Sequence, residues 1–543
     1  MNSNYIGITI GPIIDTLANT KATRELWAAS YSFSYIMKEI IRELKNNSDR
    51  AFILPYVEDI NLFSAADKRT DARYKLGSGV FPDRIIFKAA INDTKASIEK
   101  IASTVIDDFA TKVAKKIYPS KINKHVEVVS FIRQYYQIDI MEMELGTHPK
   151  PILVLSDYLN TLELQRRFPP IKSLYLQNFF SWVNSSFLVK DAFGEDHHSF
   201  ETLLHIASRT FAETPEYKHS LVTQRPNHSE SDEASLLAGN LIESPQTQRD
   251  TESDKFLISE LSRTYKGKEG NLHFKPAHKY IAIVYSDGDN IGNIIKAIEN
   301  DGEHKHAYFS KQMNQFALNA VEKIREYGGM PVYAGGDDLL FFAPVITGSS
   351  NIFQFLQELD TQFKELFNSF GISVSQSFGL SINYYKHPLS EALASSRNLL
   401  FGDAKKTGDK NNIAFRLQKH SGSYFGSVLH LVDGSTTLFL NVLNTSLKNN
   451  GSDLLRSVIY KIRESEKLIG LIGKDGPRII NFLKNNFNEQ IHHREPFKSF
   501  LTDIGSLINH CYTEPGTSVE SSQRKVYSIL RTVAFLTQNE DSK

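Results

Sequence analysis

Cysteine is almost absent from this 543-residue chain, in which Cys511 is the only one. A single cysteine cannot form an internal disulfide, and it cannot build a zinc site from several thiolates. The sequence therefore predicts neither a disulfide-stabilised secreted domain nor a cysteine-based zinc centre. We expect a protein of the reducing cytoplasm.

An excess of charge of one sign is also missing, because Lys plus Arg and Asp plus Glu both number 62. Proteins that coat nucleic acid through their overall charge need a basic excess, although a zero balance leaves room for a local basic groove. No apolar stretch reaches the roughly 20 residues that span a bilayer, and the N-terminus lacks the basic and apolar segments of a signal peptide. The sequence thus predicts no contact with a membrane.

What the chain does contain is an ordinary globular composition, with 41% hydrophobic and 23% charged residues. At about 150 residues per domain, its length suggests three or four domains. Residues 1–120 combine strand-like and helical patterns, which predicts a small α+β unit. Its strands are expected at 5–11, 51–57 and 80–87, and its helices at about 14–44 and 92–117.

Residues 121–275 predict a helical domain that ends in a linker. The pattern up to about residue 212 is mostly helical and rich in aromatic residues. Residues 213–275 are polar, with few aromatics and scattered Pro and Gly, which is typical of a flexible connection.

The clearest unit covers residues 276–425, and a mostly helical domain is expected over 426–543. The element order in the unit is β-α-α-β-β-α-β-α-β, which is typical of an elaborated ferredoxin-like domain. Strands are expected at 280–286, 331–334, 339–345, about 372–384 and 413–418, and helices at about 291–299, 306–327, 351–369 and 389–405. The predicted fold class is therefore α+β.

Two glycines and two aspartates separate two apolar strands of this unit. Gly335 and Gly336 suit a tight hairpin turn that needs positive φ. A plain hairpin with solvated carboxylates would have the same glycines, but the turn has no need for both Asp337 and Asp338, which repel each other. Clustered carboxylates are what hard cations such as Mg²⁺ require, so we predict a metal-binding catalytic hairpin.

A second acidic turn follows the first strand of the unit. In this topology the first strand lies beside the hairpin, so Asp287 and Asp289 are expected to join its carboxylates and hold two cations on a triphosphate. Gly288 lies between them, and the helix start that follows offers backbone N–H groups to phosphate at Asn290, Ile291 and Gly292. An ordinary helix N-cap is the alternative interpretation of this turn taken alone.

Lys405 ends a helix in the segment Ala-Lys-Lys-Thr-Gly at 404–408 and precedes a strand of the same unit. From there its ammonium is expected to reach a β- or γ-phosphate. The alternative is a lysine that favours the helix dipole in a last turn.

These motifs resemble a known family. DGDNIG at 287–292, YAGGDDLLFF at 333–342 and AKKTG at 404–408 are similar to the second palm domain of the large subunit of type III CRISPR effector complexes. They also resemble the wider group of nucleotide cyclases. The N-terminal segments 10–34 and 78–87 resemble the first, degenerate palm of the Cmr-type (III-B) branch, and 162–170 is a weaker match.

The resemblance implies two ferredoxin-like palm domains with a helical insert and a helical C-terminal domain, in a complex with other type III subunits, guide RNA and target RNA. It implies an ATP-dependent nucleotidyltransferase with two Mg²⁺ or Mn²⁺ ions that makes a nucleotide second messenger. Asp287, Asp337 and Asp338 would be metal ligands, with Asp289 as a further candidate, and Gly292 and Lys405 would contact phosphates. Ser30 matches a small-residue motif that faces the acceptor nucleotide, although a plain helix-face serine fits equally well.

The chain departs from the family pattern in two places. Many members begin with a His-Asp nuclease domain, but no His-Asp dipeptide occurs here, and the clusters Asp196-His197-His198 and His492-His493 are expected at the surface. Many members also bind zinc through four cysteines between the palms, where this chain has the cysteine-free segment 213–275. We therefore expect neither DNA cleavage nor zinc.

The product and two competing functions stay open at this stage. The resemblance allows either cyclic oligoadenylate or AMP joined to S-adenosylmethionine as a co-substrate. A stand-alone cyclic dinucleotide synthase would explain the second palm but not residues 5–90. A catalytically silent scaffold would have no reason to keep Asp287, Asp337 and Asp338.

Overall fold

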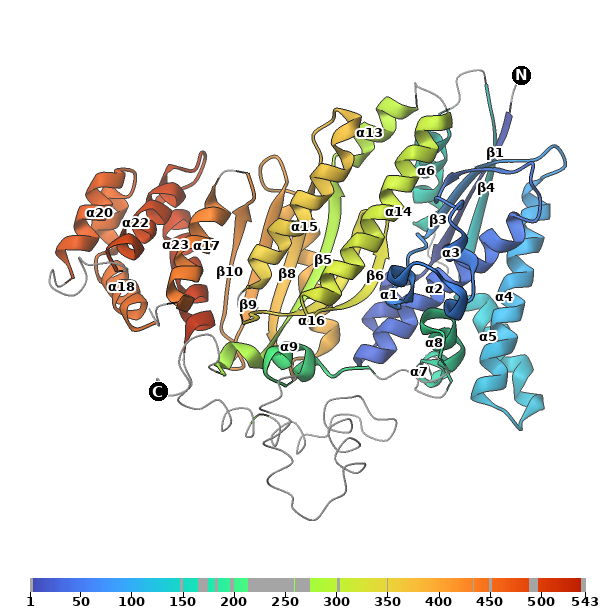
Figure 1. The fold of residues 1–543 in the computed structure, drawn as a ribbon, viewed down its shortest axis with the longest axis horizontal. Coiled ribbons are helices and arrows are strands. Elements are labelled where there is room, and N and C mark those ends of the chain that lie inside the picture. The colour runs from blue at the N-terminus through green and yellow to red at the C-terminus, as the bar shows by residue number, and fades with distance from the viewer. Residues whose placement is uncertain are drawn as a thin grey trace, which may run out of the picture.

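A computed structural model shows two β-sheets side by side, with α-helices around them and a helical C-terminal region (Figure 1). The structure describes residues 3–146, 150–164, 174–180, 184–195, 200–212, 258, 274–299, 303–348, 350–432, 434–448, 452–487 and 497–538. The predicted linker lies outside these ranges except for residue 258 and its last two residues, and both His-His clusters lie outside them too.

The first sheet has four antiparallel strands in the order β2-β3-β1-β4. The strands are β1 (Ser3–Gly11), β2 (Ala51–Leu54), β3 (Arg84–Lys88) and β4 (Gln137–Leu145). The helices of this region are α1 (Ile13–Ala18), α2 (Thr23–Leu44), α3 (Ile60–Phe63), α4 (Lys95–Ile117) and α5 (His125–Tyr135), with short 3₁₀ turns at Ala66–Lys68, Ala72–Lys75 and Ile122–Lys124. This strand order is that of a ferredoxin-like domain, as expected for the first palm.

Three details of the sequence prediction for this region are wrong. Strand β4 lies in the segment expected to be helical, and it pairs along its length with β1, so the first sheet extends past residue 120. The helix expected over 14–44 is broken between Ala18 and Thr23. The strand expected from residue 80 begins only at Arg84, because residues 77–83 cross to the second sheet instead.

Helix α2 lies between the two sheets. It is buried around most of its circumference, with Trp27, Ile36 and Met37 fully buried, which is typical of a helix covered on all sides. One hydrophobic core joins it to Val332 and to Phe342 on the strands of the second sheet. The two sheets are therefore held together by continuous apolar packing.

The second sheet has six strands in the order β10-β9-β8-β5-β7-β6. They are β5 (Tyr280–Asp289), β6 (Met330–Gly335), β7 (Asp338–Pro344), β8 (Ser375–Tyr384), β9 (Asn412–Gln418) and β10 (Tyr424–His430). The helices are α13 (Ile291–Ile298), α14 (Glu303–Glu326), α15 (Ile352–Phe367) and α16 (Leu389–Asn398), which continues as a π-helix over Leu399–Ala404; 3₁₀ turns lie at Pro276–Lys279 and Asn368–Phe370. The predicted element order is confirmed, and the first four strands repeat the order of the first sheet.

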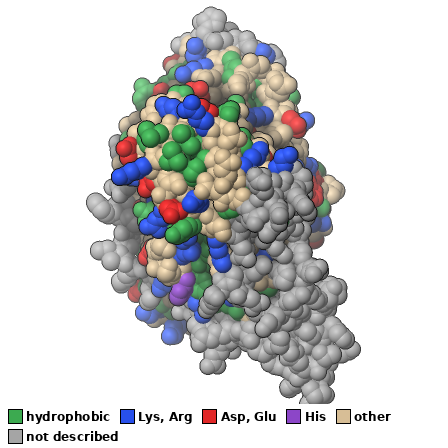
Figure 2. Space-filling view, turned by 90° about the vertical axis from the view of Figure 1, so that its left-hand side faces the viewer, with side chains coloured by type: hydrophobic (Ala, Val, Ile, Leu, Met, Phe, Trp, Pro, Cys, Tyr) green, Lys and Arg blue, Asp and Glu red, His purple; other side chains and the backbone are tan. Residues whose placement is uncertain are grey.

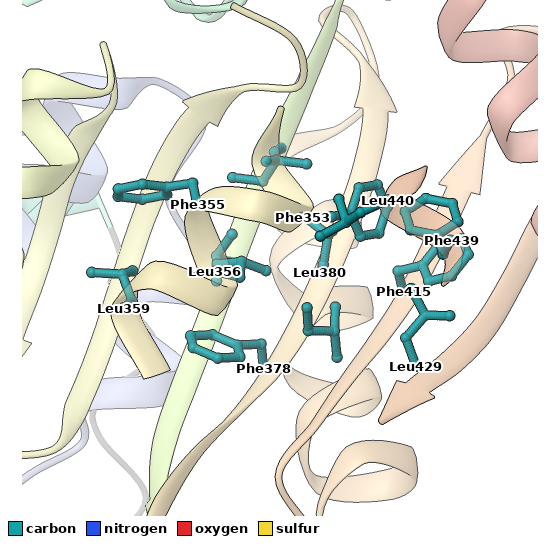
Figure 3. Close-up of a cluster of buried hydrophobic side chains, with 14 of the residues drawn as sticks. Phe353, Phe355, Leu356, Leu359, Phe378, Leu380, Phe415, Leu429, Phe439 and Leu440 are labelled. Carbon is teal, nitrogen blue, oxygen red and sulfur yellow. The ribbon is translucent and has the colours of Figure 1, made fainter. Parts of the chain in front are cut away.

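Strand β10 was not expected, because residues from 426 onward were assigned to helices. It pairs antiparallel with β9 and continues the second sheet toward the C-terminal helices. Figure 3 shows the core at this junction, where Phe353 and Leu356 of α15, Phe415 of β9 and Phe439 of α17 pack together. Burying each of these side chains contributes on the order of 2 kcal/mol, so the sheet and the C-terminal helices share one core.

The remaining helices complete the layers. They are α6 (Pro151–Glu163), α7 (Leu174–Phe179), α8 (Ser186–Phe193), α9 (Leu203–Ala212), α17 (Ser435–Lys448), α18 (Ser452–Glu464), α19 (Glu466–Ile472), α20 (Gly476–Asn485), α22 (Phe497–Thr513) and α23 (Val519–Thr537). No helix of the described part of the chain is long and apolar enough to cross a membrane.

Candidate active site

The two predicted acidic turns meet at one end of the second sheet. Strand β5 pairs with β7, and its last residues, from Asp287 to Asp289, pair with β8. A Cβ added at Gly288 would lie 2.6 Å from the Asp337 carboxylate oxygen, and the Gly288 backbone hydrogen-bonds to that carboxylate. The strand therefore continues through the turn that the sequence predicted at Asp287, and a glycine is needed there because Asp337 lies against it.

The hairpin turn has two residues at its tip, because Gly335 pairs with Asp338. Gly336 has the expected positive φ of 70°. Gly335 does not have a positive φ. A glycine is needed there because a Cβ would lie 1.9 Å from the Tyr333 hydroxyl. The two glycines thus serve different purposes, one for the turn and one for a close approach.

The carboxylates of Asp287, Asp337 and Asp338 lie close together, and the pKa values of Asp337 and Asp338 are raised. Desolvation and the Asp287 charge raise the pKa of Asp337 to about 7. Desolvation, the charges of Asp337 and Asp287 and a hydrogen bond with Asp287 raise that of Asp338 well above its ordinary value. Asp338 lies at the exposed start of β7, where the repulsion from Asp337 and Asp287 acts without the need for burial. Such a cluster favours a bound cation.

Asp289 is placed differently from the other aspartates. It is fully buried and accepts hydrogen bonds from the hydroxyls of Ser375 and Ser377 at 2.9 and 2.7 Å and from the Asn411 N–H at 3.0 Å. Its other oxygen accepts from the Lys405 ammonium at 2.8 Å. With four donors already on its two oxygens, Asp289 is placed to hold Lys405 rather than to bind an ion directly.

Lys405 reaches the acidic cluster from the end of the π-helix. Its ammonium donates to the Gly288 carbonyl at 2.7 Å and forms ion pairs with Asp287 and Asp289. Desolvation is the largest single influence on the pKa of Lys405 and lowers it. The charges of Asp287 and Asp289 together outweigh this effect, so the pKa is raised. A π-helical segment re-aims the residues that follow it, and here it delivers Lys405 to the acidic cluster.

The start of α13 lies beside the cluster. Asn290 adopts a left-handed conformation with a φ of 63°, and its side-chain amide donates to the Ser373 carbonyl at 3.3 Å. Ile291 is buried, whereas Gly292 is exposed and has no protein atom within 4 Å of the place a Cβ would take. The helix start is therefore anchored on one side and open at Gly292.

Ser30 lies away from the carboxylates, in the contact between the two sheets. Its hydroxyl is buried and donates to the Val332 carbonyl of β6 at 3.2 Å. The structure brings Asp287, Asp337, Asp338 and Lys405 together, but it does not bring Ser30 into that group.

Two residues at the site were missed from the sequence. Tyr333 lies over the glycine turn, and burial together with the charges of Asp83, Asp338 and Asp337 raises its pKa well above its ordinary value. Asp83 comes from the first palm, and its charge also raises the pKa of Asp338. Tyr333 stands two residues before Gly335, so the motif itself was the signal, whereas nothing local in the sequence links Asp83 to residue 338.

The Asp83 segment is held against the hairpin of β6 and β7 by the backbone. The Ala334 N–H donates to the Gly79 carbonyl at 3.1 Å, and Gly79 forms a parallel bridge with Tyr333. On the opposite side, the Gln376 amide donates to the Asp337 carbonyl at 2.9 Å. The hairpin is thus fixed from the first palm and from β8.

The three clustered carboxylates, of which Asp337 and Asp338 have raised pKa values, fit a hard divalent cation in the chemistry of their donors. Among the described residues, no three His, Cys, Asp or Glu side chains are arranged as a ready metal cage. Mg²⁺ is commonly held by one or two carboxylates together with substrate phosphates and water. Asp287, Asp337 and Asp338 suit this arrangement, in which the substrate and water supply the remaining ligands.

Comparisons with known families match both sheets. Residues 5–118 match the model of the CRISPR-associated protein Cmr2 N-terminal domain. Residues 280–414 match the model of the Cas10/Cmr2 second palm domain. The two models describe domains of the same kind of protein, in the same order as the two sheets.

Similarity to individual proteins agrees with these two family matches. The CRISPR system Cmr subunit Cmr2 of Pyrococcus furiosus is 30% identical over 204 residues, which cover 33% of this chain and 22% of that protein. A chain in the apo state of a type III-B Cmr-beta complex aligns with a TM-score of 0.59 at 12% identity, covering 98% of this chain and 82% of that one. The same complex bound to cognate target RNA gives 0.61 at 11% identity, with 98% and 83% covered. At such identities these structures show a shared fold.

Proposed function

Because the chain belongs to the Cas10/Cmr2 family, in its Cmr-type branch, we propose that it is the catalytic large subunit of a type III-B CRISPR effector complex. In this role it makes a nucleotide second messenger from ATP when the complex binds target RNA. Its partners are the other effector subunits, the guide RNA and the target RNA.

The observation that carries the proposal is the meeting of Asp287, Asp337 and Asp338 at the end of the second sheet. Desolvation and the charge of Asp287 raise the pKa of Asp337, and desolvation with the charges of Asp337 and Asp287 raises that of Asp338. Holding these acids together costs stability in a protein that has no use for the cluster. A nucleotidyltransferase does use such a cluster, because the triphosphate substrate binds together with metal ions that carboxylates can coordinate.

The carboxylates of Asp287, Asp337 and Asp338 would hold two Mg²⁺ or Mn²⁺ ions. Bound there, the ions would supply Lewis-acid chemistry, by polarising the α-phosphate and favouring deprotonation of an attacking hydroxyl. Gly288 lets the Asp337 carboxylate lie against β5, and Gln376 fixes the backbone of the same residue. The chain thereby presents its acidic oxygens in a fixed arrangement before the substrate binds.

Phosphate binding falls to Lys405 and the start of α13. Asp289 orients the Lys405 ammonium toward the cluster, where it can neutralise charge on a β- or γ-phosphate. The open position at Gly292 lets phosphate oxygens approach the backbone N–H groups of the helix start. Gly335 and Gly336 add no side chains of their own on the hairpin side, where Tyr333 packs against Gly335.

The first palm contributes position rather than metal ligands. Ser30 joins α2 to the backbone of β6, and the Gly79 segment braces the hairpin next to the turn. Asp83 adds a negative charge at the edge of the site. A shift of the first palm on binding target RNA would therefore act directly on the catalytic hairpin.

The chemical class of the product separates two versions of the proposal. One joins ATP units into cyclic oligoadenylate, and the other joins AMP to S-adenosylmethionine. We would assemble the full complex with guide RNA, add ATP, Mg²⁺ and target RNA with and without S-adenosylmethionine, and identify products by mass spectrometry.

The matched control is the complex carrying Asp337→Asn and Asp338→Asn, which keeps the size of both side chains. Products that require target RNA and vanish in the variant support the proposal, and their dependence on S-adenosylmethionine identifies the acceptor. If ATP is not consumed under any of these conditions, the proposal is wrong and the chain is a scaffold.

A further inference from the structure

A cationic and aromatic surface lies on the C-terminal side of the molecule, at the opposite end of the second sheet from the acidic site. It is centred on Phe425 of β10, whose ring is approached by Arg531 of α23 at 5.2 Å and by Lys419 at 5.6 Å. Lys419 follows β9, and β9 runs parallel to β8, whose first residues lie at the acidic site. The two features therefore occupy opposite ends of the sheet.

Two helices extend this surface with the same pattern. Helix α18 carries Arg456, Tyr460 and Arg463, and helix α23 carries Arg524, Tyr527 and Arg531. Spacings of three and four residues place each set on one helix face, and α23 packs against both α18 and β10. Figure 2 looks onto this side and shows Lys and Arg side chains lying beside hydrophobic ones.

Four cations of this surface, other than Arg456, lack acidic partners among the described residues. No hydrogen bond or ion pair joins the side chains of Lys419, Arg463, Arg524 or Arg531 to the part of the chain that the structure describes. Burial and the neighbouring charges of Arg531 and Arg456 lower the pKa of Lys419. Lys419 and Arg531 thus lie close together without an ion pair to a described carboxylate, which favours a bound polyanion.

The aromatic rings indicate which polyanion fits. Tyr460 is 69% exposed, and Tyr527 lies beneath Arg531 with 5.8 Å from its ring to the guanidinium. Rings interleaved with cations are typical of single-stranded nucleic acid sites, because unpaired bases stack on the rings while phosphates pair with Lys and Arg. An acidic protein would use the cations but would leave an exposed ring such as Tyr460 without a stacking partner.

We propose that Lys419, Arg456, Arg531, Tyr460 and Tyr527 form a binding surface for single-stranded RNA on the C-terminal helices, remote from the acidic site. The proposal does not depend on catalysis, since none of these residues contacts the carboxylate cluster. The surface explains how a chain with no net charge holds RNA locally.

The test uses the full chain and a fluorescein-labelled oligouridylate, with binding followed by fluorescence anisotropy over a range of salt concentrations. Lys419→Glu with Arg531→Glu is expected to weaken binding about tenfold or more at low salt. The salt slope should fall by about 1.4, which is the loss of two phosphate contacts on a single strand. Lys100→Glu with Lys121→Glu, at exposed positions of the first palm, gives the same change of net charge and is expected to leave binding unchanged.

A second variant guards against misfolding. Tyr460→Ala removes an exposed ring without altering charge, and it is expected to weaken single-stranded RNA binding several-fold while leaving the salt slope and the melting temperature unchanged. Unchanged RNA binding in both variants would overturn the proposal. So would variants that retain RNA binding but fail to assemble with the other subunits, because the surface would then be a protein interface.

Discussion

The two palms share a strand order but differ where the strands end. In the second palm, β5 ends in Asp287, Gly288 and Asp289, and a two-residue turn joins β6 to β7. In the first palm, β1 ends at Gly11, and the long connection 55–83 joins β2 to β3. One scaffold therefore carries an acidic cluster in one copy and a bracing loop in the other.

The connection in the first palm shows how the two copies depend on each other. It crosses to the second palm, where the Gly79 carbonyl accepts from Ala334. It ends at Asp83, directly before β3, just as Asp338 stands at the start of β7. The first palm thus also has an acidic residue beside the start of a strand, and its charge acts on Asp338 of the second palm. The following variants test this division of labour.

The largest effect is expected from Asp338→Asn, compared with Asp83→Asn. Loss of a metal-binding carboxylate removes several kcal/mol of transition-state stabilisation, so AMP transfer should fall by about 10³-fold or more. Asp83→Asn should cost only about tenfold, because its charge acts on Asp338 from outside the cluster. Equal losses, measured by product formation in the assembled complex, would make the first palm a catalytic partner and end the distinction.

Lys405→Met should reduce kcat/KM by about 100-fold, since it removes the cation held between Asp287 and Asp289. It leaves the buried Asp289 without a counter-charge, so the free energy of unfolding should fall by about 3 kcal/mol. Lys406→Met, at the exposed neighbouring position, is the matched control. A Lys405 variant that unfolds no more readily than the control would show that Asp289 does not need this partner.

Gly288→Ala and Gly292→Ala separate the crowded and the open glycine of the site. The first Cβ would lie 2.6 Å from the Asp337 carboxylate, so we expect about tenfold lower activity and 1–3 kcal/mol lower stability, by an order-of-magnitude estimate for overpacking. The second Cβ meets no protein atom, so stability should not fall. If the Gly288 variant behaves like the Gly292 variant in thermal unfolding and turnover, then Asp337 does not lie against β5.

The acidic cluster should make the metal-free protein less stable as pH rises. Burial and Asp287 raise the pKa of Asp337 to about 7 in the folded state, so the folded protein binds an extra proton between pH 4 and 7. That stabilisation is complete near pH 4 and is lost as pH rises through about 7. The melting temperature in EDTA should show this fall, and Asp337→Asn should reduce it. A pH profile that is the same in both proteins would contradict the predicted coupling.

Ser30→Ala tests the contact between the palms and should have the smallest effect. Losing the hydrogen bond to the Val332 carbonyl should cost about 1 kcal/mol of stability. Turnover and the KM for ATP should change by less than about twofold, since the structure places Ser30 away from the cluster. A large rise in KM would instead support the acceptor-site role that the sequence resemblance implied.

The sequence predicted the second palm well because its signals are local. Strand and helix periods set the element order, and the turn at Gly336 requires a glycine in any hairpin of this type. The meeting of Asp287 with Asp337 followed from the topology. What the sequence did not reveal is that Asp289 points inward to Ser375 and Ser377.

The missed features depend on contacts between distant segments. Strand β4 has apolar and acidic residues in partial alternation, but only its pairing with β1 identifies it as part of the first palm. In the sequence nothing distinguishes Asp83 from an ordinary surface carboxylate. Its place beside Asp338 depends on how the connection 55–83 packs against the hairpin. The π-helix before Lys405 was expected as an ordinary helix end, because no local pattern marks the change.

The most direct test of the account is pyrophosphate release from ATP by the assembled complex in Mg²⁺, measured for the natural chain and for the variant with Asp337→Asn and Asp338→Asn. The account predicts release from the natural chain when target RNA is bound and none from the variant, although both fold and assemble alike. Equal release from both complexes would show that the chemistry lies elsewhere and would contradict the assignment of catalysis to the second palm.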